Sequence, residues 1–300
     1  MSESMLSLVQ QVAGELNLAV PTYVKANPSQ DVQQILALMN AAGKNILRET
    51  TWQAMAKVHQ FYTQDLQTTA TSASGSYILT GIPSTAGLEV GWAVTGYNVP
   101  QNTTIESIDS ATQVTLSQQC SISGSNNVVF SKVLYDMPVD FLKIENSTQW
   151  DSSKRWVMLG PMTPQQWAWL LNGFISTGPR IRWRIRNNQF EIWPPGNTND
   201  FLYFEYTSKG WATTAAGVPQ NQLANDDDTT VFDDELMVVA TKLKYFQTKG
   251  FDTTSLQQNY DRILSIVKAN DKGAATLSFA PRINQTLLGW NNVPDQGYGS

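Results

Sequence analysis

Apolar residues recur every three or four positions near both ends of the chain, which is the spacing of one face of an amphipathic α-helix. Ser29 or Asp31 can cap the start of the second stretch, and Gly250 can end the third. Short helices bury too little apolar surface alone, so we expect these to pack against one another in a bundle. The stretches with this pattern are 4–17, 29–50, 236–246 and 256–267.

Between the helical ends the period changes to two, the spacing of a β-strand. Residues 55–62 and 201–206 read as strands. Residues 180–186 alternate strictly between arginine and an apolar residue, and 189–193 form the return strand of a hairpin. Its turn is Asn187-Asn188, a pair that tolerates positive φ.

Residues 67–132 differ in composition from the rest, because Ser, Thr, Gly and Asn dominate and charges are few. Short strand-like runs separated by turn residues indicate a small all-β unit. We interpret 67–132 as a β domain inserted into a host domain formed by 1–66 and 133–272. The predicted fold class is therefore α+β: a helical bundle from the N- and C-terminal helices plus a β-sheet region, with an inserted small all-β domain and an extended C-terminal arm.

Three further segments complete the host domain and the arm. Residues 163–172 read as a short helix that begins with Pro164, and 208–230 read as a polar loop. From 273 to 300 the helical period is lost, although large apolar residues remain. Such an arm must fold back, stay disordered or lie on a partner, and we favour the partner. The residues proposed for this contact are Leu277, Phe279, Pro281, Ile283, Leu288 and Trp290.

Charge is scarce in the whole chain. Charged residues make up 15% of the sequence, against about 25% in ordinary soluble domains. A surface with so little charge suits a protein that lies against neighbours in an assembly. The net charge of −5 argues against a broad basic face for nucleic acid.

Histidine and cysteine, two residue types that often carry catalysis or hold metals, are nearly missing from the sequence. The only cysteine is Cys120 and the only histidine is His59. They cannot build a His/Cys metal site or a disulfide, and His59 has no catalytic motif around it. We expect Cys120 to be a buried or edge thiol. The expectation is a non-enzyme with no catalytic residue, no cofactor and no metal. Neither a signal peptide nor an 18-residue apolar run is present, so we expect no membrane contact.

Strand alternation places Arg180, Arg182, Arg184 and Arg186 on one face of the predicted hairpin. Like charges in a row repel one another unless anions neutralise them. One reading is contact with DNA phosphates in a channel. The reading we favour is pairing with carboxylates of the same or an adjacent subunit, because guanidinium groups form such pairs in fixed geometry.

Asp226, Asp227 and Asp228 form an acidic run inside the predicted polar loop. They are candidates for a cation or for the arginine face of a neighbouring subunit. The twelfth position that an EF-hand loop fills with glutamate holds no glutamate here. We favour a solvated loop.

Four tryptophans lie close together in sequence, at Trp167, Trp169, Trp183 and Trp193. Aromatic side chains of this kind favour cores and subunit interfaces, and a glycan-binding platform is the alternative. We expect core or subunit packing.

The order of these elements resembles head–tail adaptor proteins of short-tailed bacteriophages, the connector or tail tubular protein A-like family. The resemblance covers roughly 1–65 and 133–270, and residues 67–132 resemble β modules of phage structural proteins. The motifs that carry it are Leu16 to Pro21, Val32 to Glu49, Thr51-Trp52, Tyr135 to Lys143, Arg184 to Pro195, and Phe232 to Leu236 followed by Lys242 and Lys244.

The resemblance implies a structural protein of the virion, assembled in the host cytoplasm and placed at the head–tail interface. It implies a ring of about twelve copies between portal protein and tail or nozzle protein, with transient contact to passing DNA. It also implies that the arm reaches the portal.

Two other functions stay open on the sequence. One is a receptor-binding or decoration tail protein that uses the β insertion. The other is a cell-wall hydrolase with a β accessory module, which would need two carboxylates about 5 to 10 Å apart in a cleft.

Overall fold

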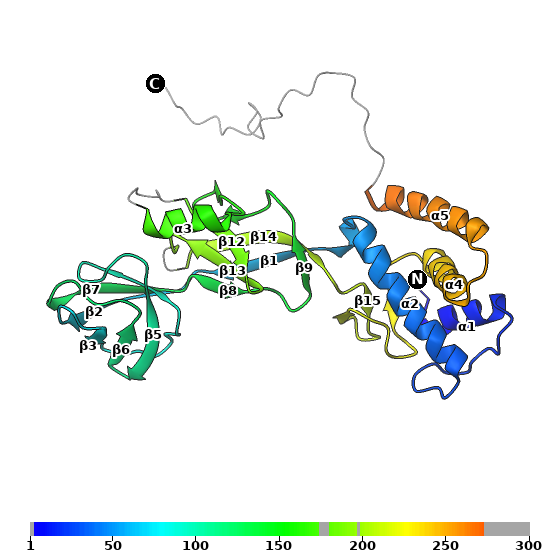
Figure 1. The fold of residues 1–300 in the computed structure, drawn as a ribbon, viewed down its shortest axis with the longest axis horizontal. Helices are drawn as coiled ribbons and strands as arrows, with labels where there is room; N and C mark the ends of the chain where they lie inside the picture. The colour runs from blue at the N-terminus through cyan, green and yellow to red at the C-terminus, as the bar shows by residue number, and fades with distance from the viewer. Residues whose placement is uncertain (1–2, 174–179, 197–198, 273–300) are drawn as a thin grey trace, which may run out of the picture.

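The computed structural model describes residues 3–173, 180–196 and 199–272. The molecule is elongated, with a β-barrel at one end, two sheets in the middle and a layer of helices at the other end (Figure 1). The described residues form five α-helices and several antiparallel sheets. The predicted mixed α+β class is therefore confirmed.

The helices at the right of Figure 1, here called the helical layer, come from both ends of the chain. Helix α4 contacts all three of the others, and its apolar face is buried among them. Asp233 caps its start, and Gly250 ends it in the left-handed region at φ 74°. The helices are α1 (Met5–Glu15), α2 (Gln30–Glu49), α4 (Asp234–Lys249) and α5 (Thr254–Lys272).

The segment predicted as a polar loop is part of the helical core, and that expectation was wrong. It contains a small sheet of β15 (Ala212–Thr213), β16 (Pro219–Gln220) and β17 (Thr229–Thr230). Trp211 is fully buried beneath α2. A Cβ added at Gly43 would come within 2.4 Å of the Trp211 ring, so α2 needs a glycine there for the indole to fit.

Two small sheets in the middle of the molecule share a core rich in aromatic rings, including Phe190 stacked on Trp183 and Phe204. The hairpin turn holds Asn187 and Asn188 at φ 51° and 58°, as predicted. A 3₁₀ turn, η1 (Gln53–Met55), leads into the first sheet. That sheet contains β1 (Ala56–Tyr62), β14 (Phe201–Ser208), β9 (Phe141–Ile144), β10 (Trp150–Asp151) and β11 (Trp156–Val157). The second contains β12 (Arg182–Arg186), β13 (Gln189–Trp193) and β8 (Leu134–Asp136).

Six strands that lie in sequence between β1 and β8 close into a barrel with its own apolar core. Asp65 pairs with Ser131, so the chain enters and leaves the barrel at adjacent positions. Cys120 is buried, as expected, and burial raises the pKa of its thiol. The strands are β2 (Asp65–Ser72), β3 (Ile78–Thr80), β4 (Ala93–Gly96), β5 (Thr103–Ser110), β6 (Gln113–Leu116) and β7 (Gly124–Ser131).

The short helix α3 (Pro164–Asn172) lies beside the hairpin β12–β13 (Figure 1). Thr163 and Gln166 form a capping box at its start, with Pro164 as the first helical residue. Trp167 and Leu170 are its buried residues. The helix predicted over 163–172 is confirmed.

Candidate interaction surfaces

The arginine row forms two ion pairs with a carboxylate of the same chain. Glu191, on the neighbouring strand β13, accepts from Arg184 Nε at 2.5 Å and from Arg186 Nη2 at 3.2 Å. Strand β12 begins at Arg182, so Arg180 precedes the strand and is exposed. Arg184 and Arg186 thus form intrachain ion pairs with Glu191. A role of the row at a subunit interface or in a channel stays a prediction.

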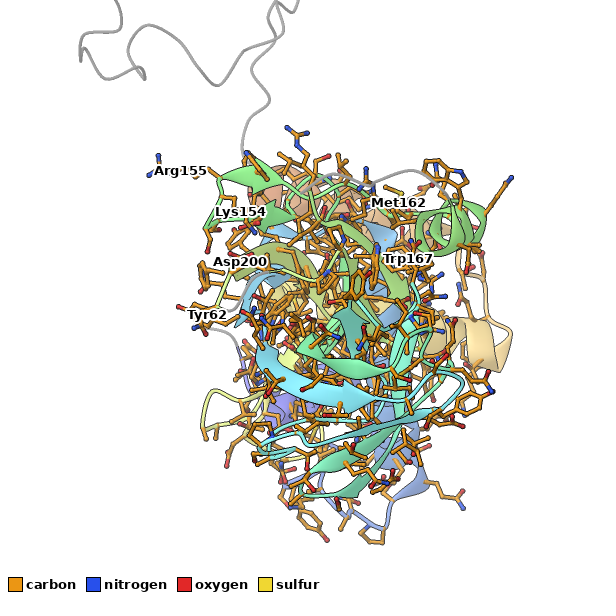
Figure 2. The ribbon with its side chains drawn as sticks, turned by 90° about the vertical axis from the view of Figure 1, so that its left-hand side faces the viewer. Tyr62, Lys154, Arg155, Met162, Trp167 and Asp200 are labelled. Atoms are coloured by element: carbon orange, nitrogen blue, oxygen red, sulfur yellow. The ribbon has the colours of Figure 1, made fainter. Side chains whose placement is uncertain are left out.

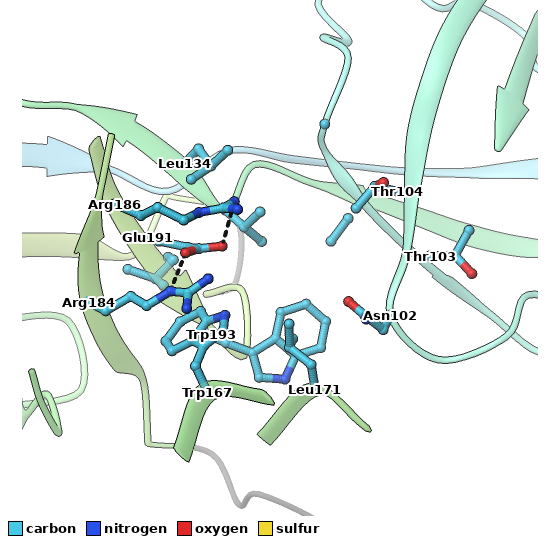
Figure 3. Close-up of a pocket in the computed structure, with 14 residues that line it drawn as sticks. Asn102, Thr103, Thr104, Leu134, Trp167, Leu171, Arg184, Arg186, Glu191 and Trp193 are labelled. Atoms are coloured by element: carbon cyan, nitrogen blue, oxygen red, sulfur yellow. Dashed lines mark hydrogen bonds and ion pairs between the residues drawn. The ribbon is translucent and has the colours of Figure 1, made fainter. Parts of the chain in front are cut away.

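These pairs line a pocket of about 220 Å³ between α3, the hairpin and the barrel (Figure 3). The Arg184 guanidinium carbon lies 4.5 Å from the centre of the Trp167 ring, a cation–π contact. From the barrel side, Asn102 and Thr104 face this cluster. The pocket is thus a polar and aromatic seam between the barrel and the second sheet.

The four tryptophans do not share one environment. Trp167 and Trp183 are buried, as the core interpretation expected, and Trp193 is half-buried. Trp169 is 55% exposed on the outer face of α3. A large exposed indole on a regular helix marks α3 as a surface suited to contact with another molecule.

The acidic run is mostly built into the structure, and the interpretation as a solvated loop was wrong for two of its members. Asp228 is 1% exposed, and one carboxylate oxygen accepts from the Ala224 and Asn225 backbone N–H groups, each at 2.8 Å. Asp226 Oδ1 accepts from the backbone N–H of Val24 and Lys25. Only Asp227 is exposed. The Asp226 carboxylate fastens the loop to the N-terminal segment, and the Asp228 carboxylate holds the loop to itself. The candidacy of the acidic run for a cation or a neighbouring subunit stays a prediction.

The segment between β8 and β9 is part of the motif Tyr135 to Lys143, but sequence reasoning did not predict that it presents an apolar side chain on a rigid support. Val139 is 93% exposed. Its neighbour Asp140 accepts hydrogen bonds from Lys57 Nζ at 2.6 Å and from the hydroxyls of Tyr206 and Ser208. Burial would raise the pKa of Asp140, but these donors outweigh it and lower the pKa to about 2. In the sequence, the one signal of this exposed side chain is Pro138, which precedes Val139.

A second ion-pair cluster lies where the first sheet meets the barrel (Figure 2). Lys154 pairs with Asp151 and Asp200, and these carboxylates outweigh burial and raise the pKa of Lys154. Arg155, beside it, is exposed with φ 57°. Tyr62 is 58% exposed and its ring lies 5.0 Å from that of Phe201. This edge offers aromatic and cationic contacts.

The arm residues Leu277, Phe279, Pro281, Ile283, Leu288 and Trp290 lie outside the described residues. Within residues 3–173, 180–196 and 199–272, histidine, cysteine and carboxylate side chains form no group of three that would hold a metal ion. In the same ranges, no helix combines the length and the hydrophobicity needed to cross a membrane.

Comparison with known proteins gave no match: the chain fits no protein-family model, and no curated protein matches its sequence.

Proposed function

We propose that this protein is a structural head–tail adaptor of a phage virion, which forms a ring between portal and tail through which DNA passes. The observation that carries the proposal is the pairing of helices from the two chain ends in one layer, beside a β region that extends from it (Figure 1). This arrangement agrees with the one that the adaptor resemblance implies. In the proposal, the layer is the bundle that meets neighbouring subunits.

The surface features of the described residues support a role in assembly. Side chains that normally avoid water stand exposed in different parts of the molecule, such as Tyr97 at 77%, Val139 at 93% and Ile266 at 50%. Single exposed apolar residues are ordinary, but Val139 is also fixed by its neighbours and Ile266 lies on a helix of the layer. Preorganised apolar groups of this kind favour contact with a partner because little conformational freedom is lost on binding.

In this proposal the barrel is a domain inserted into the adaptor core. Its single continuous stretch, its separate core and its adjacent entry and exit strands support this view. The arm, residues 273–300, would reach the portal. The ring would close by heterologous contacts between identical copies, and the net charge of −5 per copy would let DNA pass without adhering.

The proposal is tested by measuring mass with light scattering, with the purified chain alone and after mixing with the portal protein encoded in the same genome. We expect a ring species, either free or formed only on the portal. A chain truncated after Lys272 is the matched variant, because it keeps the described fold and should lose portal binding.

A chain that stays a single copy in the presence of the portal, with no co-migration, would contradict the adaptor function. Binding that persists unchanged after truncation would keep the ring and remove the portal role of the arm.

A receptor-binding or decoration role is favoured by one observation, the exposure of Tyr97 at 77% and Val90 at 63% on the barrel at the far end of the molecule. Virions that carry a deletion of 67–132 separate the two functions. If particles join head to tail but fail to adsorb, the barrel is the receptor-binding part.

A further inference from the structure

The pocket between α3, the hairpin β12–β13 and the barrel has the size and the lining of a small-ligand site (Figure 3). Its volume is about 220 Å³, below the roughly 300–1,000 Å³ of pockets that hold drug-sized ligands. The indoles of Trp167 and Trp193 lie on one side, and Asn102 and Thr104 lie on the barrel side. The size therefore suits a ligand of one ring rather than a peptide.

The charged groups in the lining favour an anionic ligand. The charged residues that line the pocket are Arg184, Arg186 and Glu191. Two guanidinium groups and one carboxylate leave one positive charge without a counterpart in the lining. Arginine is not deprotonated in proteins, so this charge is present at every ordinary pH. An anion that enters the pocket would complete the neutralisation that Glu191 begins.

Both guanidinium groups keep donors that such an anion can use. Each group has five N–H donors, and the Glu191 carboxylate accepts from one N–H of Arg184, at 2.5 Å, and one of Arg186, at 3.2 Å. Within the part of the chain that the structure describes, neither side chain donates to a further acceptor. The Arg186 side chain is 52% exposed, so a ligand can reach it. The remaining N–H groups suit a carboxylate, which guanidinium groups hold in forked geometry.

The uncharged part of the lining suits a hydroxylated, saturated ring. Trp193 is half-buried, and an indole face is electron-rich, so it attracts the weakly positive C–H groups of such a ring. On the barrel side, the Thr104 hydroxyl forms no hydrogen bond within the described residues, and Asn102 donates one of 3.4 Å to Asn172. Hydroxyl and amide groups both donate and accept, which matches the hydroxyls of a sugar.

We propose that this pocket binds one acidic hexose unit, a sugar ring that carries a carboxylate. The carboxylate lies at the Arg184 and Arg186 guanidinium groups, and the C–H face of the ring packs on Trp193. The ring hydroxyls reach Thr104, so the bound sugar joins the barrel to the second sheet. This site belongs to the single chain and does not depend on the adaptor function.

The first test is a calorimetric or ligand-observed NMR titration of the purified full chain with glucuronate, glucose and acetate. Glucose has the ring without the carboxylate, and acetate has the carboxylate without the ring. We expect a dissociation constant of about 1 mM for glucuronate, which is the order expected of a ligand of this size. Glucose and acetate should each bind roughly fivefold more weakly or less, because each lacks one half of the contacts.

Three variants locate the binding in the pocket. Arg186→Gln keeps the Arg184–Glu191 pair and should weaken glucuronate binding about fivefold without changing glucose binding. Its matched control is Arg180→Gln, since Arg180 belongs to the same arginine row, is exposed and lies outside the pocket lining. Thr104→Val removes a hydroxyl at nearly constant shape and should weaken both sugars about threefold. Thermal melts check that the variants fold alike, and Thr104→Val decides the test if Arg186→Gln melts earlier.

Four outcomes would overturn the proposal. Glucuronate could fail to bind at concentrations well above the expected dissociation constant, or acetate or glucose could bind as tightly as glucuronate. Glucuronate could also bind with unchanged affinity in both pocket variants, which would place its contact elsewhere. All of these measurements use the chain and a free sugar, so their failure leaves portal binding untouched and is distinguishable from failure of the proposed function.

Discussion

The barrel and the helical layer close their cores in opposite ways. The barrel uses one continuous stretch, and its six strands pair in the order β2-β3-β6-β5-β4-β7 until the sheet closes. The helical layer joins α1 and α2 to α4 and α5, which follow nearly two hundred residues later in the chain. The loop that contains Asp226 is held to the N-terminal segment over a similar separation in sequence, because the Asp226 carboxylate accepts from the backbone N–H groups of Val24 and Lys25.

The difference indicates which part can change independently. A unit with a local core and adjacent ends can be gained or lost without disturbing its host, whereas a layer built from both chain ends requires all of its helices. We therefore predict that the helical layer and the two middle sheets fold without the barrel. Four predictions test this contrast.

The largest effect is expected from removing whole elements. Replacing 65–131 with an Asn-Gly turn should leave the remainder folded, because Asp65 and Ser131 are already paired neighbours. Deleting 1–18 should unfold the helical layer, because α1 contributes five buried residues, each worth about 1.5–3 kcal/mol for a large apolar side chain. Thermal melts followed by circular dichroism measure both. A cooperative melt of the chain without α1 at the original temperature would contradict the contrast.

Two glycines in the helical layer should respond to alanine with opposite signs. Gly43→Ala would push a methyl group into the Trp211 ring, and we expect a loss of about 1–3 kcal/mol in the free energy of unfolding. Gly14→Ala meets open space in α1, and we expect a gain of about 0.5–1 kcal/mol. Urea denaturation compares them. Equal effects would mean that Trp211 does not pack against α2 as described.

A pair of aspartates compares the two regions directly. Asp228→Asn in the helical layer places an amide N–H₂ among backbone donors at a site 1% exposed, which should cost about 1–3 kcal/mol. Asp109→Asn in the barrel should change little, because Asp109 is exposed and its hydrogen bonds to Ser107 and Thr115 are at the surface. The denaturant midpoints of the two variants are compared with that of the wild-type protein. A larger loss of stability in Asp109→Asn than in Asp228→Asn would contradict the view that Asp228 is a structural carboxylate and Asp109 a surface one.

The smallest effect concerns acid stability in the loop between β8 and β9. The pKa of Asp140 is lowered from 3.8 to about 2 in the folded protein, so its ionised form stabilises the fold. This contribution is complete above pH 3.8 and is lost as the pH falls through about 2. Asp140→Asn should therefore lower stability at neutral pH and flatten the pH dependence between 4 and 2. A wild-type pH profile in the variant would show that Lys57 and Tyr206 do not hold this carboxylate.

Elements with a strong period could be predicted from the sequence. The four long helices, the Asn187-Asn188 hairpin and the capped helix α3 all follow from spacing and turn chemistry that act locally. The segment after Ser208 could not be predicted, because its polar composition resembles a loop. Trp211 is buried there against Gly43 of α2, which lies more than 160 residues earlier in the chain. The local sequence pattern cannot indicate a contact over that separation.

The candidate surfaces were predictable only in part. Alternation placed Arg184 and Arg186 on one face, but nothing in the sequence showed that Glu191 would neutralise both from the opposite strand. Asp228 looked solvated because its partners are backbone N–H groups, which leave no trace in side-chain patterns. The exposed Val139 was missed since its support comes from Lys57, Tyr206 and Ser208, distant in the chain.

The central claim, that this chain joins head to tail, is tested most directly by disrupting its gene in the encoding virus and imaging the particles. The account predicts DNA-filled or leaking heads that lack tails, with tail components free, and full recovery when the intact chain is supplied. Complete, tailed particles in the absence of the chain would contradict it.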